Sequence, residues 1–197
     1  SNSLKWVGYL SSTSVYGDHQ GRWVDETTPC LPTSKRSQKR LEAENAWLAS
    51  GLPIHIFRLS GIYGEGRSVF SRLESDALGQ RIQKPGHKFS RIHVTDICQI
   101  LMDSMNKPSP GEIFNMADDL PAESREVIEY ACDLIGRPYP PLVPFAQAIL
   151  SERDKAFYED NKCVSTQKLK SFFDTPLTYP TYKEGLLDIY RHLTHKL

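Results

Sequence analysis

The feature that most constrains this chain is the alternation of short apolar runs with longer amphipathic segments. Trp6–Leu10 is an apolar run that ends in a polar loop, and Pro53–Leu59 is a second run rich in strand-forming residues. Between them lies a helical pattern that Thr33 or Ser34 can cap and that ends at Gly51. Parallel strands need a long crossover connection, so this order predicts an α/β fold built on a parallel sheet.

The same alternation continues to the end of the chain. Further strands are predicted at Ile92–Val94 and Glu112–Ala117. Helices are predicted around Phe70–Leu78, after an N-cap at Thr95 or Asp96, up to Gly136, over Ala146–Glu159, after Ser165 or Thr166, and over Leu186–Leu193. The prolines between Pro138 and Pro144 predict a rigid, extended connector.

Composition excludes several classes of function. The chain has 197 residues, and its 24 Lys and Arg balance its 24 Asp and Glu, so no overall field attracts nucleic acid or an anionic membrane. No apolar run approaches the roughly 20 residues of a membrane-spanning helix, and the polar start is not a signal peptide. We expect a soluble protein in a reducing compartment.

The four cysteines predict free thiols and no metal site. They are Cys30, Cys98, Cys132 and Cys163, and they form neither a CxxC pair nor a Cys/His metal spacing. Cys98 and Cys132 lie within apolar helical patterns, which predicts that both are buried. Metal-dependent hydrolysis is therefore a weak alternative, because the ligands for it are lacking.

Seven segments, in sequence order, resemble motifs of one family. They are SSTSVYG at Ser11–Gly17, DETTP at Asp25–Pro29, RLSGIYG at Arg58–Gly64, RIHVTD at Arg91–Asp96, GEIFN at Gly111–Asn115, VSTQKL at Val164–Leu169 and YPTYKEG at Tyr179–Gly185. Together they resemble the extended short-chain dehydrogenase/reductases of the NAD-dependent epimerase/dehydratase family. The resemblance implies a Rossmann-like parallel sheet with a small C-terminal α/β substrate lobe, to which residues 65–90 and 118–197 contribute.

The sequence departs from the family at the cofactor fingerprint. The family begins its nucleotide domain with a strand and a G-x-x-G-x-x-G turn that seats the cofactor pyrophosphate on a helix N-terminus. This sequence has no such turn, and Trp6–Leu10 resembles a later strand of the family. We expect that another part of the protein supplies the N-terminal half or that it was removed. The resemblance implies NAD or NADP as cofactor of the complete protein, and weak or absent binding by this chain alone.

A second departure concerns proton transfer. Without gaps, Arg36 falls where the family has its catalytic tyrosine, and Arg40 falls where it has the lysine. Arginine has no acceptor and keeps its proton, so ordinary tyrosine-dependent chemistry is not expected. Two other YxxxK strings, Tyr158–Lys162 and Tyr179–Lys183, do not lie on the helix after the serine strand, and we interpret them as coincidence.

The resemblance assigns candidate site residues. Ser12 matches the catalytic serine or threonine, so the catalytic candidates are Ser12, Arg36 and Arg40; the cofactor-binding candidates are Ser11, Arg40, Ser60 and Gly61. Ser12 could equally satisfy backbone groups at the strand end, and the two arginines could form a solvated basic face. Gly61 replaces the family's asparagine and so removes a polar contact.

Two classes of function remain open. The first is a divergent NAD(P)-dependent epimerase, dehydratase or oxidoreductase that acts on a nucleotide sugar or a similar carbonyl substrate. The second is a noncatalytic nucleotide-binding or assembly protein that kept the fold and lost the tyrosine. Expected partners are the small-molecule substrate and the missing N-terminal half or another subunit, with a homodimer as a further option.

Overall fold

A three-stranded parallel sheet forms the centre of the computed structural model, which describes residues 4–75 and 78–194. The strands β1 (Val7–Ser12), β3 (Ile54–Leu59) and β7 (Glu112–Met116) lie in the order β1-β3-β7. Tyr9 pairs with Ile56, and Ile56 pairs with Ile113. All six residues of β3 are buried, because this strand has a neighbour on each side and helices on both faces. The predicted parallel α/β fold is confirmed.

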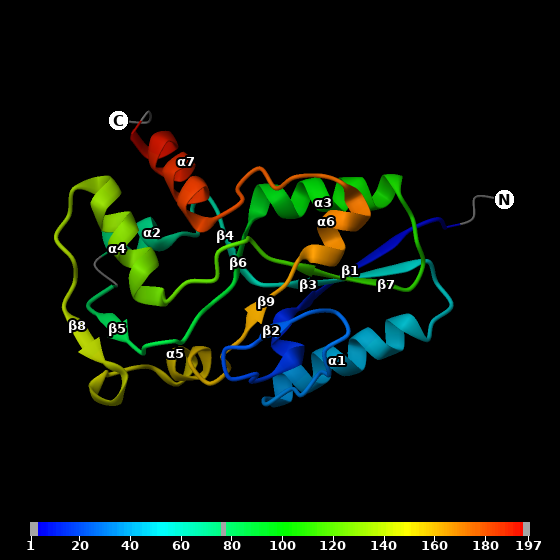
Figure 1. Cartoon of the computed structure of the whole chain (residues 1–197), viewed down its shortest axis with the longest axis horizontal. Coiled ribbons are helices and arrows are strands. Elements are labelled where there is room, and N and C mark those ends of the chain that lie inside the picture. The colour runs from blue at the N-terminus through cyan, green and yellow to red at the C-terminus, as the bar shows by residue number, and fades with distance from the viewer. Residues whose placement is uncertain (1–3, 76–77, 195–197) are drawn as a thin grey trace.

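Helices cover both faces of this sheet (Figure 1). Helix α1 (Lys35–Leu48) lies on one face of the sheet. Helices α3 (Val94–Asn106) and α6 (Gln167–Phe173) pack against the apolar core on the opposite face. Ser34 caps α1 as predicted, because its Oγ accepts from Ser37 N at 3.1 Å. The predicted cap of α3 is wrong: His93 is the N-cap, and its Nδ1 accepts from Thr95 N at 3.2 Å.

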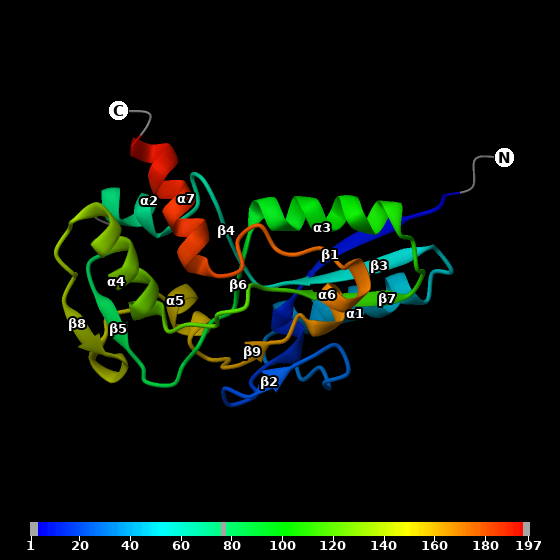
Figure 2. The same ribbon diagram turned by 45° about the horizontal axis from the view of Figure 1, so that its top comes forward.

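A second group of elements forms the smaller lobe, at the left in Figure 2. Its apolar core includes residues of α2 (Val69–Glu74), α4 (Ser124–Ile135) and α7 (Tyr182–Thr194). A parallel pair of short strands, β5 (Arg81–Gln83) and β8 (Leu142–Pro144), lies beside α4. The assignment of residues 65–90 and 118–197 to a substrate lobe stays a prediction, and α6 within that range packs on β7 and the sheet core.

Short strands connect the sheet with this lobe. Strand β4 (Gly61–Tyr63) pairs with β6 (Arg91–His93), and β2 (Trp23–Val24) pairs with β9 (Cys163–Val164). The remaining elements are the 3-10 turns η1 (Thr13–Tyr16) and η2 (Phe145–Gln147) and helix α5 (Glu152–Phe157).

Several local predictions are wrong. The helix predicted over Ala146–Glu159 is reduced to η2 and α5, whereas residues 142–144 of the predicted extended connector form a strand and so are extended. Helix α2 ends at Glu74, and the predicted extension through residues 76–77 lies outside the described residues. All four cysteines are free, but Cys98 is exposed on α3 rather than buried. No helix of the described residues is long and apolar enough to cross a membrane.

A buried polar network joins α1 to all three strands of the sheet. Arg58 on β3 donates from Nη2 to Oε2 of Glu44 on α1 at 2.7 Å, and both side chains are at most 5% exposed. The same guanidinium donates from Nη1 to Tyr16 OH at 3.0 Å, and Tyr16 donates to Asn115 Oδ1 on β7 at 2.8 Å. Ser11 on β1 completes the network by donating to Glu44. Each member offsets the desolvation of its neighbours.

An aromatic cluster links the loop before β6 to the end of α5. The rings of Phe89 and Phe157 stack with centroids 3.8 Å apart, and His87 lies 4.6 Å from Phe89 and 5.3 Å from Tyr158. Burial of the His87 imidazole, helped by the positive charge of Lys84, lowers its pKa to about 4. His87 therefore stays neutral at physiological pH and packs as an aromatic residue.

We expect Glu44→Ala to destabilise the fold by about 3–5 kcal/mol, because it leaves the Arg58 charge buried without its partner. Glu42→Ala, at an exposed position of the same helix, should change the free energy of unfolding by less than about 0.5 kcal/mol. Urea denaturation of both variants measures the difference. Equal effects would show that the buried pair contributes nothing specific.

We also expect acid to destabilise the protein through His87. The unfolded histidine binds a proton near pH 6.5, whereas the folded one does so only near a pKa of about 4. The free energy of unfolding therefore falls as the pH drops through this window and levels off below it. His87→Phe should flatten this part of the profile, measured by urea denaturation between neutral pH and about pH 4. Parallel profiles for the two proteins would contradict it.

Candidate functional site

The candidate site is a cavity of about 470 Å³ at the carboxyl ends of β1 and β3. Ligands of open α/β sheets bind at this edge, because the loops there diverge and leave a crevice. We call it the Ser12 pocket. The lining residues that matter for its chemistry are Ser12, Ser60, Tyr63, Arg91, Asp160 and Lys162.

Ser11 and Ser12 point in different directions because side chains alternate along a strand. Ser11 is 3% exposed and its hydroxyl donates to Glu44, so it serves the buried network. Ser12 begins η1, where its Oγ accepts from Ser14 N at 3.2 Å, and it lines the pocket. The described hydrogen bonds use Ser12 only as an acceptor, so its own O–H remains available to a ligand oxygen.

Ser60 and Gly61 follow β3 and also line the pocket. The Ser60 hydroxyl is buried, and it has no hydrogen-bond partner among the described residues. A buried hydroxyl without a partner is costly, so a polar ligand group that completes its bonding would be favoured here. The backbone N of Gly61 donates to Ser90 O at 3.1 Å, and this bond fixes the position of Gly61.

The structure leaves Arg36 and Arg40 outside the lining of the Ser12 pocket. Both lie in the first half of α1, and Arg40 Nη1 donates to Leu10 O on β1 at 3.1 Å. Arg40 thus contacts the strand that carries Ser12, two residues before it. Arg36 is exposed, and its side chain makes no hydrogen bond or salt bridge within residues 4–75 and 78–194. Their roles stay predictions.

Sequence reasoning missed the basic side chains of this pocket. Lys162 enters it from the segment before β9, and Arg91 enters it from β6. Burial lowers the pKa of Lys162, although the nearby Asp160 carboxylate opposes this shift. No local pattern marks Lys162, because its contacts come from segments that are distant in the sequence.

Two groups near the Ser12 pocket, the Tyr63 phenol and the Asp118 carboxyl group, have raised pKa values, which favours their neutral forms. Burial raises the pKa of Tyr63, whose hydroxyl has no partner among the described residues, and the Asp118 carboxylate adds to the shift. Burial also raises the pKa of Asp118 to about 7, although Leu120 N donates to it and Arg91 lies near. Tyr63 therefore remains a hydrogen-bond donor across the physiological range.

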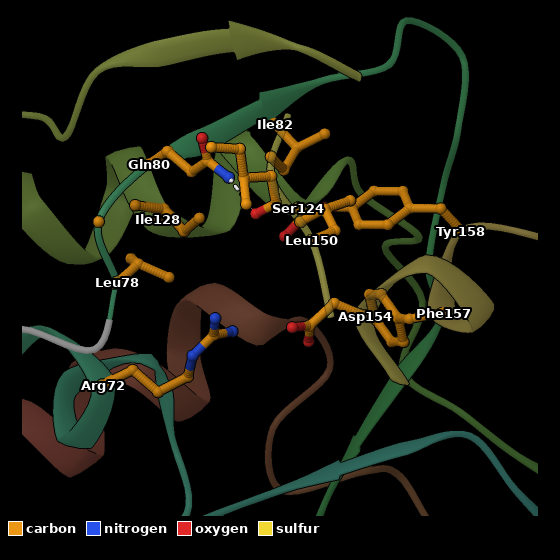
Figure 3. A pocket seen from close by; sticks show the side chains of 12 residues that line it. Arg72, Leu78, Gln80, Ile82, Ser124, Ile128, Leu150, Asp154, Phe157 and Tyr158 are labelled. Carbon is orange, nitrogen blue, oxygen red and sulfur yellow. Dashed lines mark hydrogen bonds between the residues drawn. The ribbon is translucent and has the colours of Figure 1, made fainter. Parts of the chain in front are cut away.

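The Ser12 pocket continues into the smaller lobe. Phe157 lines it together with two further cavities of about 410 and 400 Å³. Figure 3 shows the last of these, where the side chain of Arg72 of α2 points toward that of Asp154 of α5, and Ile82 and Ile128 line the opposite side.

Metal chemistry has no support in the described part of the chain. Within it, no group of three or more His, Cys, Asp or Glu side chains is arranged to hold a metal ion.

Comparisons with known proteins identify the relatives of this chain. Protein YeeZ of Escherichia coli is 34% identical over 110 residues, which cover 55% of this chain and 38% of YeeZ. Human dTDP-D-glucose 4,6-dehydratase is 26% identical over 138 residues, which cover 64% of this chain and 39% of the enzyme. The chain thus matches less than half of the length of these curated relatives. No protein-family model matches it.

Solved structures share the fold over nearly the whole chain. A conserved protein of unknown function from Silicibacter pomeroyi is 48% identical, with a TM-score of 0.89 over 95% of this chain and 66% of that protein. The dTDP-glucose 4,6-dehydratase of Bacillus anthracis, solved in complex with NAD, is 22% identical, with a TM-score of 0.75 over 95% of this chain and 61% of the enzyme.

These homologues and structural neighbours include members of the NAD-dependent epimerase/dehydratase family, and the resemblance predicted from the motifs is confirmed. The cofactor of the family is NAD(P), as the NAD-bound neighbours show. The Rossmann-like fold predicted for the chain is confirmed by the same neighbours.

We expect the two adjacent serines to respond differently to replacement by alanine. Ser11→Ala removes a buried hydrogen bond to a charged group and should lower the free energy of unfolding by about 1.5–3 kcal/mol. Ser12→Ala should cost less, because its Oγ accepts only one local bond at 3.2 Å. Thermal or urea unfolding measures both, and a larger loss for Ser12→Ala would reverse the roles given to these residues.

Proposed function

We propose that the complete protein is an NAD(P)-dependent epimerase- or dehydratase-like enzyme that acts on a nucleotide sugar or a similar carbonyl substrate. The observation that carries this proposal is the Ser12 pocket, where Ser12 and the unpartnered Ser60 hydroxyl meet at the carboxyl ends of two parallel strands. The known activities of relatives such as dTDP-D-glucose 4,6-dehydratase support the substrate class.

The residues at the pocket fit the nicotinamide end of the cofactor. Ser60 Oγ lacks a partner and could bond the carboxamide, while Gly61 leaves room beside it. Of the other cofactor-binding candidates, Arg40 of α1 contacts β1 outside the pocket lining, and Ser11 is engaged with Glu44. When bound, NAD(P) would supply oxidation and reduction at a substrate carbon.

The substrate part of the proposal rests on charge. Arg67, Lys88 and Arg91 line the Ser12 pocket with Lys162, and Asp160 is the acidic residue among its lining side chains. This excess of positive charge favours a phosphate-bearing ligand. Ser12 would donate its hydroxyl proton in a hydrogen bond to a substrate oxygen, and the two cavities of the lobe would hold the rest of the ligand.

A noncatalytic nucleotide-binding or assembly role is the second candidate. It is favoured by one observation: the two residues at the family's proton-transfer positions, Arg36 and Arg40, lie outside the pocket lining and cannot exchange a proton near neutral pH. This role would keep dinucleotide binding but show no conversion of any nucleotide sugar.

Dinucleotide binding tests the proposed function first. We expect the full-length gene product to bind NADH or NADPH and the 197-residue chain to bind them weakly or not at all, because the chain has no pyrophosphate-binding turn. Fluorescence titration measures both. Arg40→Ala should weaken binding by the full-length protein, whereas Lys39→Ala, an exposed neighbour, should not.

Conversion of UDP- and dTDP-sugars, followed by chromatography and mass spectrometry, then separates the two candidates. Turnover supports the enzyme, and binding without turnover supports the alternative. If the full-length protein bound neither dinucleotide, the enzyme and the nucleotide-binding alternative would both fail, and only the assembly role would be left. Micromolar binding by the 197-residue chain would contradict our expectation that another segment holds the cofactor.

A further inference from the structure

Lys162 is the best-anchored titratable side chain of the Ser12 pocket. The residue before it, Asn161, accepts from His19 N at 3.1 Å and from Gly21 N at 2.9 Å. Its side-chain oxygen accepts from Lys88 N at 3.1 Å, and its side-chain nitrogen donates to Gly86 O at 3.0 Å. The backbone that carries Lys162 is therefore fixed between the loop after η1 and the loop before β6.

One of the three N–H donors of the Lys162 ammonium group has no acceptor among the described residues. Nζ donates to Gly17 O at 2.9 Å and to Asp160 Oδ2 at 3.4 Å, and the side chain is 10% exposed. Asp160 is itself held by Thr33, whose hydroxyl donates to Oδ1 at 3.0 Å. Because an ammonium has three N–H donors, one remains for a ligand in the pocket that Lys162 shares with Ser12.

Other charged groups of the pocket are less suited to exchanging a proton. Arg67 and Arg91 keep their protons throughout the physiological range. Tyr63 has a pKa raised by burial, so it holds its proton more firmly than an ordinary tyrosine. The titratable or charged groups around Lys162 are Asp160 on its own segment, Asp18 and His19 after η1, Lys84 and Lys88 before β6, and Tyr63, Arg67 and Arg91 across the pocket.

We propose that Lys162 is the proton-transferring residue of the Ser12 pocket. It performs the proton transfer for which Arg36 and Arg40, at the family's tyrosine and lysine positions, are chemically unsuited. The proposal rests on the proposed function. One proton moves from Nζ to a ligand oxygen: the N–H bond breaks, an O–H bond forms, and nitrogen keeps the electron pair. No electrons are exchanged in this step. The amine regains its proton from solvent, or takes one from a ligand hydroxyl in the reverse direction.

The environment of Lys162 is suited to this role. Burial lowers the pKa of its ammonium towards the working range of an acid or base, while Asp160 and Asp18 limit the shift and keep the group charged before transfer. Gly17 O and Asp160 also fix the direction of Nζ. The Tyr158–Lys162 string is thus a coincidence as a motif, but its lysine lies in the candidate site.

Competitive acetylation tests the proposal without substrate or cofactor. The full-length protein is treated with trace acetic anhydride across a pH series, and peptide mass spectrometry gives the titration midpoint of each lysine. Exposure changes the rate but not the midpoint. We expect the midpoint of Lys162 to lie below that of Lys39, an exposed lysine of α1, because burial lowers the pKa of the Lys162 ammonium. An equal or higher midpoint would overturn the proposal.

A conservative variant of the full-length protein separates charge from proton transfer. Lys162→Arg keeps a positive donor that cannot release its proton. We expect it to lower kcat on a nucleotide sugar by about 10²–10⁴-fold while dinucleotide affinity and thermal unfolding change little. Lys39→Arg is the matched control.

Unchanged turnover in Lys162→Arg would reject the proposal. Absence of turnover in the unmodified protein would instead reject the proposed enzyme, and the acetylation midpoint would still decide the role of the lysine.

Discussion

The buried pair of Arg58 and Glu44 is the interaction on which the arrangement of the site depends. An unpaired charge in the core would cost several kcal/mol, so every element that brings a partner is held in place. These elements are α1 through Glu44, β1 through Ser11, η1 through Tyr16 and β7 through Asn115. Ser12 follows Ser11 directly, and Ser60 lies two residues after Arg58. The network therefore fixes the two strand ends that carry the pocket.

Side chains alternate along β1, so the adjacent residues Ser11 and Ser12 have different surroundings. Ser11 faces α1 and is consumed by the network, while Ser12 lines the pocket. A similar division separates the arginines. Arg58 is a buried structural residue, and Arg91 lines the pocket and donates to the carbonyls of Phe89 and Ala122. The protein thus places a forked cation on a fixed frame twice, once within the core and once in the lining of the Ser12 pocket.

Predictions from the sequence succeeded where the signal was local and long. The helix at Lys35–Leu48 carries its own cap at Ser34, and β3 is an unbroken run of strand-forming residues. They failed for β5 and β8, because a three-residue strand has too few side chains to show a period and exists only through its partner. The His93 cap was missed for a related reason: imidazole is an uncommon cap, and its Nδ1 acts here as the acceptor.

The sequence by itself determined the order of strands and helices, the parallel α/β class, the family resemblance and the place of Ser12 and Ser60 at strand ends. These follow from periodicity, caps and motif order, which neighbouring residues encode. Only the tertiary structure brought Lys162 and Asp160 from before β9, and Arg91 from β6, to the same pocket as Ser12. Packing brings these distant segments together, and no local pattern records which remote side chains will share a cavity.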